Sequence, residues 1–477
     1  MRSVKAQIIW FLILGPGLFV AALAGNELYG WLLVRHELKL CREAGMELDP
    51  AKLVPPPVPD DQNAAPLYLK ALAEMRTKEA SAPAAVKAAL ECFPAVPSEG
   101  FFEKPEWRRQ AQVFLNYYQP VMELTDEAAR KAACRFPDEQ YVGFTEDIFS
   151  PSNSIMYCRG WRTMMVVYVS GAEEGYLSAV QDLKVAREIM PNGCLGNLLG
   201  KRVLLWRVLH DLQLMLQTGP PPRAATARAV LRALPDEAEV RRWIHAAGSG
   251  QVIDMTQREF PEQRRQWLRL TRIADRQNEA SALRCCRLIC EHGGRPGAPA
   301  EVRTWPADHP YFVTRREPDR RYPFPWHRIS WAGIGEGQLS TAAEALAEAQ
   351  LVRVALLLEL YGQEHGEYPE KREGLRITAG GSVPLDPYDG QPMRYRREGD
   401  GYRIWSVGKN LKDDGGVSQE ENYERLRDAE GIVVEEDYDS YDLVMVVNSA
   451  ARAVRKVEHD KLFADFEAQR KATGAGP

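Results

Sequence analysis

The sequence predicts a mainly α-helical protein that begins with a transmembrane helix and ends in a small α+β module. Three observations predict this fold class: an apolar run near the N-terminus, a long central region with helically spaced apolar residues, and a C-terminal helical pattern followed by turns and short strand-like runs. With 477 residues, of which 45% are hydrophobic, the chain is long enough for about two or three domains with their own cores.

Changes in composition divide the chain into segments. In order, they are a membrane anchor (1–36), a juxtamembrane helix with a Pro-rich spacer (37–65), a helical body (66–303), a connector rich in Pro and aromatic residues (304–337), an α+β module (338–448) and a polar tail (449–477). The prolines of the spacer mark its position, because a proline run ends a helix and favours an extended chain.

The segment Ala6–Gly25 is almost entirely apolar and follows Arg2 and Lys5. At about 1.5 Å per residue, such a helix crosses a bilayer core of about 30 Å. A cleaved signal peptide is the alternative, since Ala22–Ala24 forms an A-x-A site. The apolar pattern resumes over Leu28–Val34, which favours an anchor. We expect a single-pass protein of the bacterial inner membrane, with its bulk on the periplasmic side.

Charge and cysteine usage narrow the possible partners. A net charge of −5 without a long Lys/Arg run predicts no nucleic-acid partner. The cysteines are dispersed, so no disulfide framework can be read from them. Cys285, Cys286 and Cys290 lie near His292, but no C-x-x-C pair accompanies them. Buried thiols in an apolar core are the favoured interpretation of this cluster, and a metal site is the alternative.

The body shows helical periodicity from about residue 66 to 294. One apolar stripe comprises Tyr176, Ala179, Val180, Leu183, Ala186 and Met190, and a second comprises Leu198, Leu199, Val203, Trp206 and Leu209. Gly175–Glu188 is similar to the second helix of a tetratricopeptide-type hairpin. Stacked helical hairpins are the predicted body, with a plain helical bundle as the alternative.

No complete catalytic motif is present. Leu195 stands where a P-loop needs its first glycine, and Gln338 where a dinucleotide fingerprint needs its last. We therefore expect a non-catalytic protein, with an envelope hydrolase using carboxylates in the helical body as the competing hypothesis. A pocket with a buried carboxylate pair and a shifted pKa favours the hydrolase, whereas an apolar groove without such a pair favours a binding protein.

The segment Trp305–Trp331 is rich in Pro, Arg and aromatic residues. Aromatic side chains in such number predict packing onto the helical body, with an exposed strip for a partner as the alternative. After it, Thr341–Tyr361 reads as an amphipathic helix about 30 Å long. Turn residues at 384–391 then precede two strand-like runs, Met393–Arg396 and Tyr402–Val407.

Several short motifs follow this helix in a fixed order: H-G-x-Y-P from His365, x-D-P-x-D-G-x-P from Leu385, G-Y-x-I-x-S-V-G from Gly401, and an acidic loop. Over Thr341–Val447 the chain resembles the globular region of the major pseudopilin of type II secretion, the general secretion pathway protein G-like family. The resemblance implies a long helix on a small antiparallel sheet, with a calcium-binding loop near the end.

The N-terminal part of the chain differs from a pseudopilin and resembles a different group of proteins. It lacks the prepilin pattern, because Ala22 stands where a glutamate would follow a cleavage at Gly17. Processing and polymerisation as a pseudopilin are therefore not expected. The first seventy or so residues, including Val58–Lys70 (VPDDQNAAPLYLK), resemble uncharacterised membrane-anchored proteins of planctomycete-type bacteria, a resemblance that implies no activity.

The acidic loop is the candidate calcium site. Asn410, Asp413 and Asp414 lie in Asn410–Gly416, whose two glycines permit a tight backbone path. Calcium takes about six to eight oxygen ligands, so the return segment with Asp437, Asp439 and Asp442 is needed to complete the shell. A solvated acidic loop is the alternative. The chain as a whole is expected to serve protein–protein interaction or envelope assembly and secretion; its partner and oligomeric state are not predicted.

Overall fold

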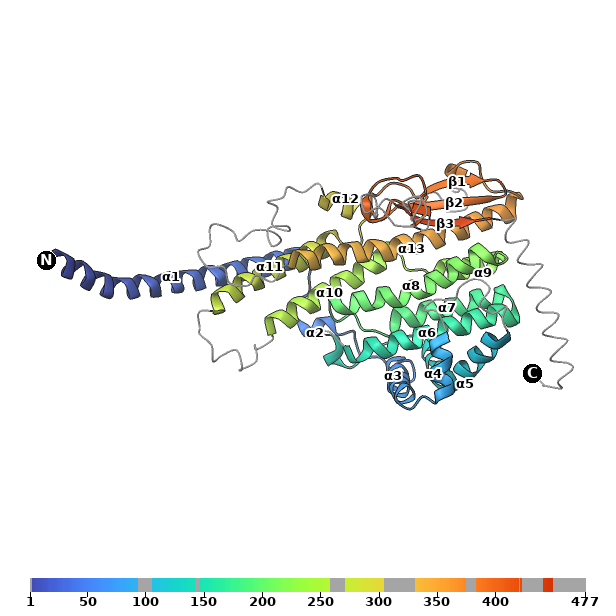
Figure 1. Ribbon diagram of the computed structural model, residues 1–477, viewed down its shortest axis with the longest axis horizontal. Helices are drawn as coiled ribbons and strands as arrows, with labels where there is room; N and C mark the ends of the chain where they lie inside the picture. Colours follow the sequence, from blue (N-terminus) through green and yellow to red (C-terminus); the bar gives the residue numbers. More distant parts are fainter. Residues whose placement is uncertain are drawn as a thin grey trace, which may run out of the picture.

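The computed structural model describes residues 2–92, 105–141, 146–257, 271–303, 331–374, 383–419, 421–422 and 441–448. Helices dominate these residues (Figure 1). They are α1 (Arg2–Glu43), α2 (Pro50–Leu53), α3 (Ala65–Ala80), α4 (Ala84–Cys92), α5 (Pro105–Arg130), α6 (Glu146–Ser170), α7 (Ala172–Glu188), α8 (Leu195–Thr218), α9 (Ala224–Ala233), α10 (Glu237–Gln257), α11 (Thr271–His292), α12 (Ala298–Arg303) and α13 (Trp331–His365).

Three strands form one antiparallel sheet in the order β1 (Arg394–Glu398), β2 (Gly401–Ser406) and β3 (Leu443–Val447). Tyr402 pairs with Arg397 on one side and with Val447 on the other. Both predicted strand-like runs are therefore strands, and the prediction of a mainly helical chain with a small antiparallel sheet is confirmed. Residues 304–330 of the predicted connector lie outside the described residues.

Helix α1 packs against α11 near its C-terminal end and extends away from the body at its N-terminal end (Figure 1). Gly45, at φ 79°, follows the helix, and the amide of Met46 donates to the carbonyl of Cys41. A glycine in this conformation ends a helix without a Cβ clash. Among the residues whose side chains are described, no helix is long and apolar enough to cross a membrane. Most side chains of the predicted anchor, at 2–16, 19–20, 22–23 and 26, lie outside that set.

The body is built from helices that pack on their neighbours in the chain, with α6 on α7 and α7 on α8. Tyr176, Ala179, Leu183 and Ala186 of the first predicted stripe are buried. The prediction of the second buried stripe is only partly right, because the Leu199 side chain is 40% exposed. Helix α8 lies among α6, α7, α10 and α13, so its buried surface is broader than a single stripe.

The cysteine cluster is part of this core. Cys285, Cys286 and Cys290 are buried, as predicted, and so is Cys41 of α1. All described cysteines except Cys92, whose side chain is not described, are free thiols. Burial raises the pKa of Cys41 to about 12. Because the thiolate is the reactive form, these side chains act as small apolar residues in the packing of α1, α10 and α11.

Helix α13 is buried on two sides rather than along one amphipathic stripe. It packs against α8, α9 and α11 of the body, and against β2 and β3 of the sheet (Figure 1). Its buried apolar residues include Ala345, Leu346, Ala347, Ala349, Leu351, Val352, Val354, Ala355, Leu356, Leu357, Leu358 and Leu360. Small alanines let both layers approach the helix closely, while the leucines fill the space between them. The helix therefore belongs to the body and to the C-terminal module at once.

The turn before the sheet is organised by Asp386, which is fully buried. One carboxylate oxygen accepts hydrogen bonds from the Tyr388 amide at 2.9 Å and the Ser406 hydroxyl at 2.8 Å. The other accepts from the Val407 amide at 2.9 Å and the Arg394 guanidinium at 2.7 Å. A buried carboxylate needs such partners. The x-D-P-x-D-G-x-P stretch thus ties the turn to β1 and β2.

Because α13 is buried on two sides, we predict that a destabilising change in this helix affects the helical body and the sheet together. Leu358→Ala should lower the free energy of unfolding by about 2–5 kcal/mol, because it removes a fully buried side chain. Hydrogen exchange in the full chain should speed up in both α8 and β2. Leu177→Ala, at a side chain that is 42% exposed, is the control and should change stability by less than about 0.5 kcal/mol. Faster exchange in only one of the two layers would contradict shared dependence on α13.

Candidate functional site

The predicted calcium loop is a hydrogen-bonded turn that includes Asn410, Asp414 and Asp442. The Asn410 amide donates to an Asp414 carboxylate oxygen at 2.7 Å. Asp442, which directly precedes β3, accepts from the Gly416 amide at 2.7 Å and from the Asp414 amide at 3.4 Å. Gly415 and Gly416 have φ near 78° and 77°, which lets the backbone curl around these groups. Asp437 and Asp439 lie outside the described residues.

Asp413 occupies a different environment. Its Oδ1 accepts hydrogen bonds from the Trp405 indole at 2.9 Å and from the Gly415 amide at 3.1 Å, and its Oδ2 lies 3.6 Å from Arg394 Nε. Burial, with the nearby carboxylates of Asp414 and Asp413, raises the pKa of Asp442 to about 6. The oxygen-rich donor set suits calcium in chemistry, yet many of these oxygens already accept N–H groups of the protein.

Within the residues that the structure describes, no group of three or more His, Cys, Asp or Glu side chains is arranged to hold a metal ion.

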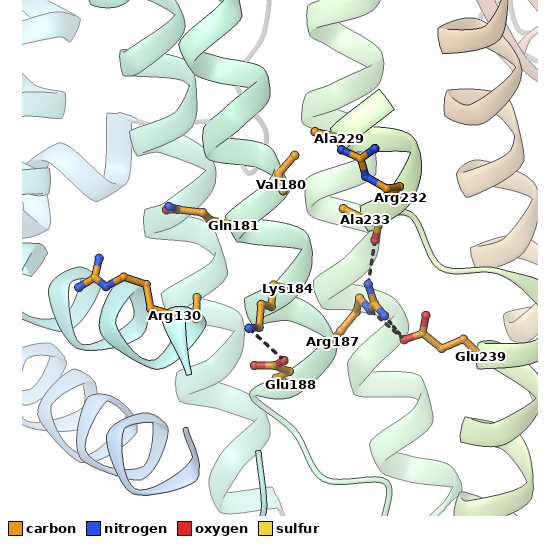
Figure 2. Close-up of a pocket in the computed structure, with 11 residues that line it drawn as sticks. Arg130, Val180, Gln181, Lys184, Arg187, Glu188, Ala229, Arg232, Ala233 and Glu239 are labelled. Atoms are coloured by element: carbon orange, nitrogen blue, oxygen red, sulfur yellow. Dashed lines mark hydrogen bonds and ion pairs between the residues drawn. The ribbon is translucent and has the colours of Figure 1, made fainter. Parts of the chain in front are cut away.

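A basic pocket lies elsewhere, in the helical body. It has a volume of about 700 Å³ and lies between α7 and α9, with the C-terminal end of α5 and the first turn of α10 at its borders (Figure 2). Gln181, Lys184 and Glu188 project into it from α7 at helical spacing. None of the residues predicted as calcium ligands lines this pocket.

The inner cations of the pocket are fixed by the protein. Arg187 donates to the Ala233 carbonyl at 3.0 Å and forms an ion pair with Glu239 at 2.6 Å. Lys184 donates to the Lys131 carbonyl at 2.8 Å and lies 3.9 Å from Glu188. Held in this way, both side chains lose little further conformational freedom when a ligand binds.

Lys201 of α8 adds positive charge behind the pocket. Its ammonium donates to the Arg187 carbonyl and to the Asn192 side chain, both at 2.7 Å, and lies 5.1 Å from the centre of the Trp243 ring. Only 3% of the residue is exposed. Burial lowers its pKa to about 8, against the charged form.

The outer cations are Arg130 of α5 and Arg232 of α9, both exposed. Figure 2 shows them on opposite sides of α7. Neither guanidinium has a hydrogen-bond or ion-pair partner among the described residues. With Lys184 and Arg187, the lining carries four cations against the carboxylates of Glu188 and Glu239. The pocket is thus positive, although the whole chain has a net charge of −5.

Two buried carboxylates that influence each other are also present in the body, outside the lining of this pocket. Asp182 and Asp211 are 1% and 4% exposed. Asp182 accepts from Arg159 at 2.6 Å and from Thr163 at 2.6 Å. Burial and the charge of Asp182 raise the pKa of Asp211 well above its usual range. The hydrolase hypothesis needs such a pair inside a pocket, and neither residue lines the pocket described above.

The sequence contained part of the signal for this site. The polar face of α7 is visible as Gln181, Lys184 and Glu188, opposite its apolar stripe. Such a face is usually only solvated. Its approach to Arg232 depends on the packing of α7 against α9, which periodicity alone does not reveal.

Comparison of the chain with known protein families, curated proteins and solved structures finds no match to any of them.

The burial of Lys201 gives a pH prediction. Between about pH 8 and 10.5 the unfolded chain keeps a proton on this amine that the folded protein releases, so stability rises with pH in that window. Relative to Lys201→Met, the wild type should gain about 2 kcal/mol in unfolding free energy between pH 7.5 and 9.5. Urea unfolding at both values measures this difference. Lys87→Met, at an exposed lysine of α4, is the control, and a pH-independent difference between the wild type and Lys201→Met would refute the assignment.

Proposed function

We propose that this chain is a membrane-anchored, non-catalytic protein of the bacterial cell envelope whose helical body binds a protein partner. The observation that carries the proposal is the form of α1, a continuous helix that projects from the body and carries exposed apolar side chains (Figure 1). The same helix is fixed to the body at its other end.

The exposed side chains of α1 include Leu18, Leu28, Tyr29, Trp31 and Leu32, which are between 42% and 69% exposed. Clustered apolar exposure of this kind is unusual in water and favours contact with lipid or protein. Arg35 lies over the Trp31 ring at 5.2 Å. An aromatic ring beside a basic residue is typical of the membrane–water interface. This supports a bilayer segment N-terminal to Trp31.

Glu37 marks the point where α1 joins the body. It is 2% exposed and pairs with Arg284 at 2.7 Å and Arg287 at 3.5 Å, both on α11. A buried carboxylate that loses such partners is strongly unfavourable, so the pair holds α1 in one orientation. In the proposed function, this contact fixes the orientation of the body relative to the membrane segment.

The anchor can be tested in a Gram-negative host. The full-length chain should remain in the membrane after carbonate extraction, and protease added to spheroplasts should digest its body. Leu14→Arg with Leu18→Arg should release most of the protein, because each arginine near the centre of a membrane helix costs about 2.5–3.5 kcal/mol. Leu177→Arg, on an exposed face of α7, is the control. A mature N-terminus at Gly25, or a body resistant to the protease, would rule out the proposed topology.

We also propose that the C-terminal module binds one calcium ion through Asn410, Asp413 and Asp414, completed by Asp442 and by Asp439. The support is a two-glycine turn in which the Asn410 side chain donates to the Asp414 carboxylate and the Asp442 carboxylate accepts from the Asp414 and Gly416 amides. Calcium would offset the repulsion among these carboxylates.

Calcium binding should appear as a stabilisation of the full chain in detergent. About 10 mM calcium added after a chelator should raise the Tm by about 1–3 °C, the mass-action effect of a Kd between about 0.1 and 1 mM. Asp413→Ala with Asp414→Ala should abolish this increment, and Glu364→Ala, at an exposed residue of α13, should retain it. Identical melting curves of the wild type with and without calcium would end the proposal.

A further inference from the structure

We infer that the basic pocket between α7 and α9 binds an acidic peptide segment of a partner protein, one that presents two carboxylates separated by small or apolar residues. This inference rests on the proposed function, because it names the chemistry of the partner that the body recognises. It uses the charges, the burial and the shape of the pocket itself.

The charge of the pocket selects an anion. Lys184 and Arg187 are placed by hydrogen bonds to backbone carbonyls, and the buried ammonium of Lys201 lies directly behind Arg187. Glu239 is already paired with Arg187 at 2.6 Å. The Tyr68 hydroxyl donates to Glu188 at 3.2 Å and so occupies one acceptor site of that carboxylate. The inner part of the pocket therefore presents cations whose positions are set before a ligand arrives.

The two arginines at the rim of the pocket determine how many anionic groups a matching ligand carries. Arg130 and Arg232 lie on opposite sides of α7 and have no partner among the described residues (Figure 2). Each guanidinium offers a planar pair of donors that matches a carboxylate. A ligand that engages both rims must carry two separate anionic groups, which a single inorganic anion does not supply.

The surface between the rims is small and partly apolar. Ala129, Val180, Ala229 and Ala233 line it, and a volume of about 700 Å³ accommodates several side chains rather than one ionic group. Carboxylates at the rims with methyl-sized residues between them fit this arrangement. A peptide in which glutamate alternates with alanine has this chemistry, and it is the probe used below.

The test measures binding of a fluorescently labelled Glu-Ala peptide of about eight residues to the full chain in detergent micelles. At about 50 mM salt the peptide should bind, whereas the matching Gln-Ala peptide should not. Affinity should fall steeply as salt rises, since partly exposed charges are screened. Arg130→Glu with Arg232→Glu should weaken binding of the Glu-Ala peptide at least tenfold.

The matched control is Arg109→Glu with Arg228→Glu. These residues lie on the same two helices, are exposed, and do not line the pocket, so the change in net charge is identical. Binding to this variant should stay within about twofold of the wild type, because a screened long-range charge has a small effect. Equal Tm values for the two double variants establish that both are folded.

Three results would overturn the inference. They are absence of peptide binding at low salt, equal weakening by the two double variants, and binding of inorganic phosphate at the pocket without binding of the peptide. Failure of the proposed membrane anchor would leave all of these measurements unaffected, because they are made in micelles. Conversely, a retained anchor with no peptide binding would leave the topology standing and remove only the proposed partner class.

Discussion

Helix α13 is the element on which both layers of this protein depend. A helix with one apolar stripe can serve one layer, but α13 carries Ala and Leu around its surface and is covered from two sides. Tyr402 of β2 donates to Glu359 of α13 at 2.8 Å, which fixes the sheet on the helix by a directional contact as well as by apolar packing. The other side of the helix completes the core of the body.

Several buried charges of this protein are held by partners on other elements. Arg159 of α6 is fully buried between Asp126 of α5 and Asp182 of α7. Asp386 joins the turn to the sheet, and Glu37 joins α1 to α11. Replacement of one partner leaves an uncompensated charge, so these pairs restrict how the helices can be arranged. Among the described residues, Asp211 and Glu348 depart from this pattern: burial raises the pKa of Asp211 well above its usual range and that of Glu348 to about 8.

Much of the fold was predictable from the sequence because it depends on local pattern. The stripe from Tyr176 to Ala186 and the strand around Tyr402 both follow from spacing and residue type. The amphipathic reading of Thr341–Tyr361 was incomplete, because it did not include the second layer that covers the helix. For the candidate calcium site, the spacing of Asn410, Asp414 and Asp442 located a hydrogen-bonded turn, and calcium binding there stays a prediction. The basic pocket was not predicted, since Arg130, Lys184 and Arg232 belong to three helices whose proximity is a tertiary property.

The contact between Glu37 and α11 also bears on how the basic pocket would be presented. A flexible linker would let the body sample many orientations relative to a membrane, whereas a helix that continues from the proposed bilayer segment into a buried ion pair limits them. Helices α7 and α9, which line the pocket, lie in the body away from the end at which α1 projects (Figure 1). Under the proposed topology, α1 therefore acts as a rigid spacer that keeps the cations of the pocket at a distance from the lipid headgroups. Electrostatic attraction to anionic lipid decays within about one Debye length, roughly 8–10 Å at physiological salt, so a pocket held farther than this from the headgroups is available to acidic protein segments in solution.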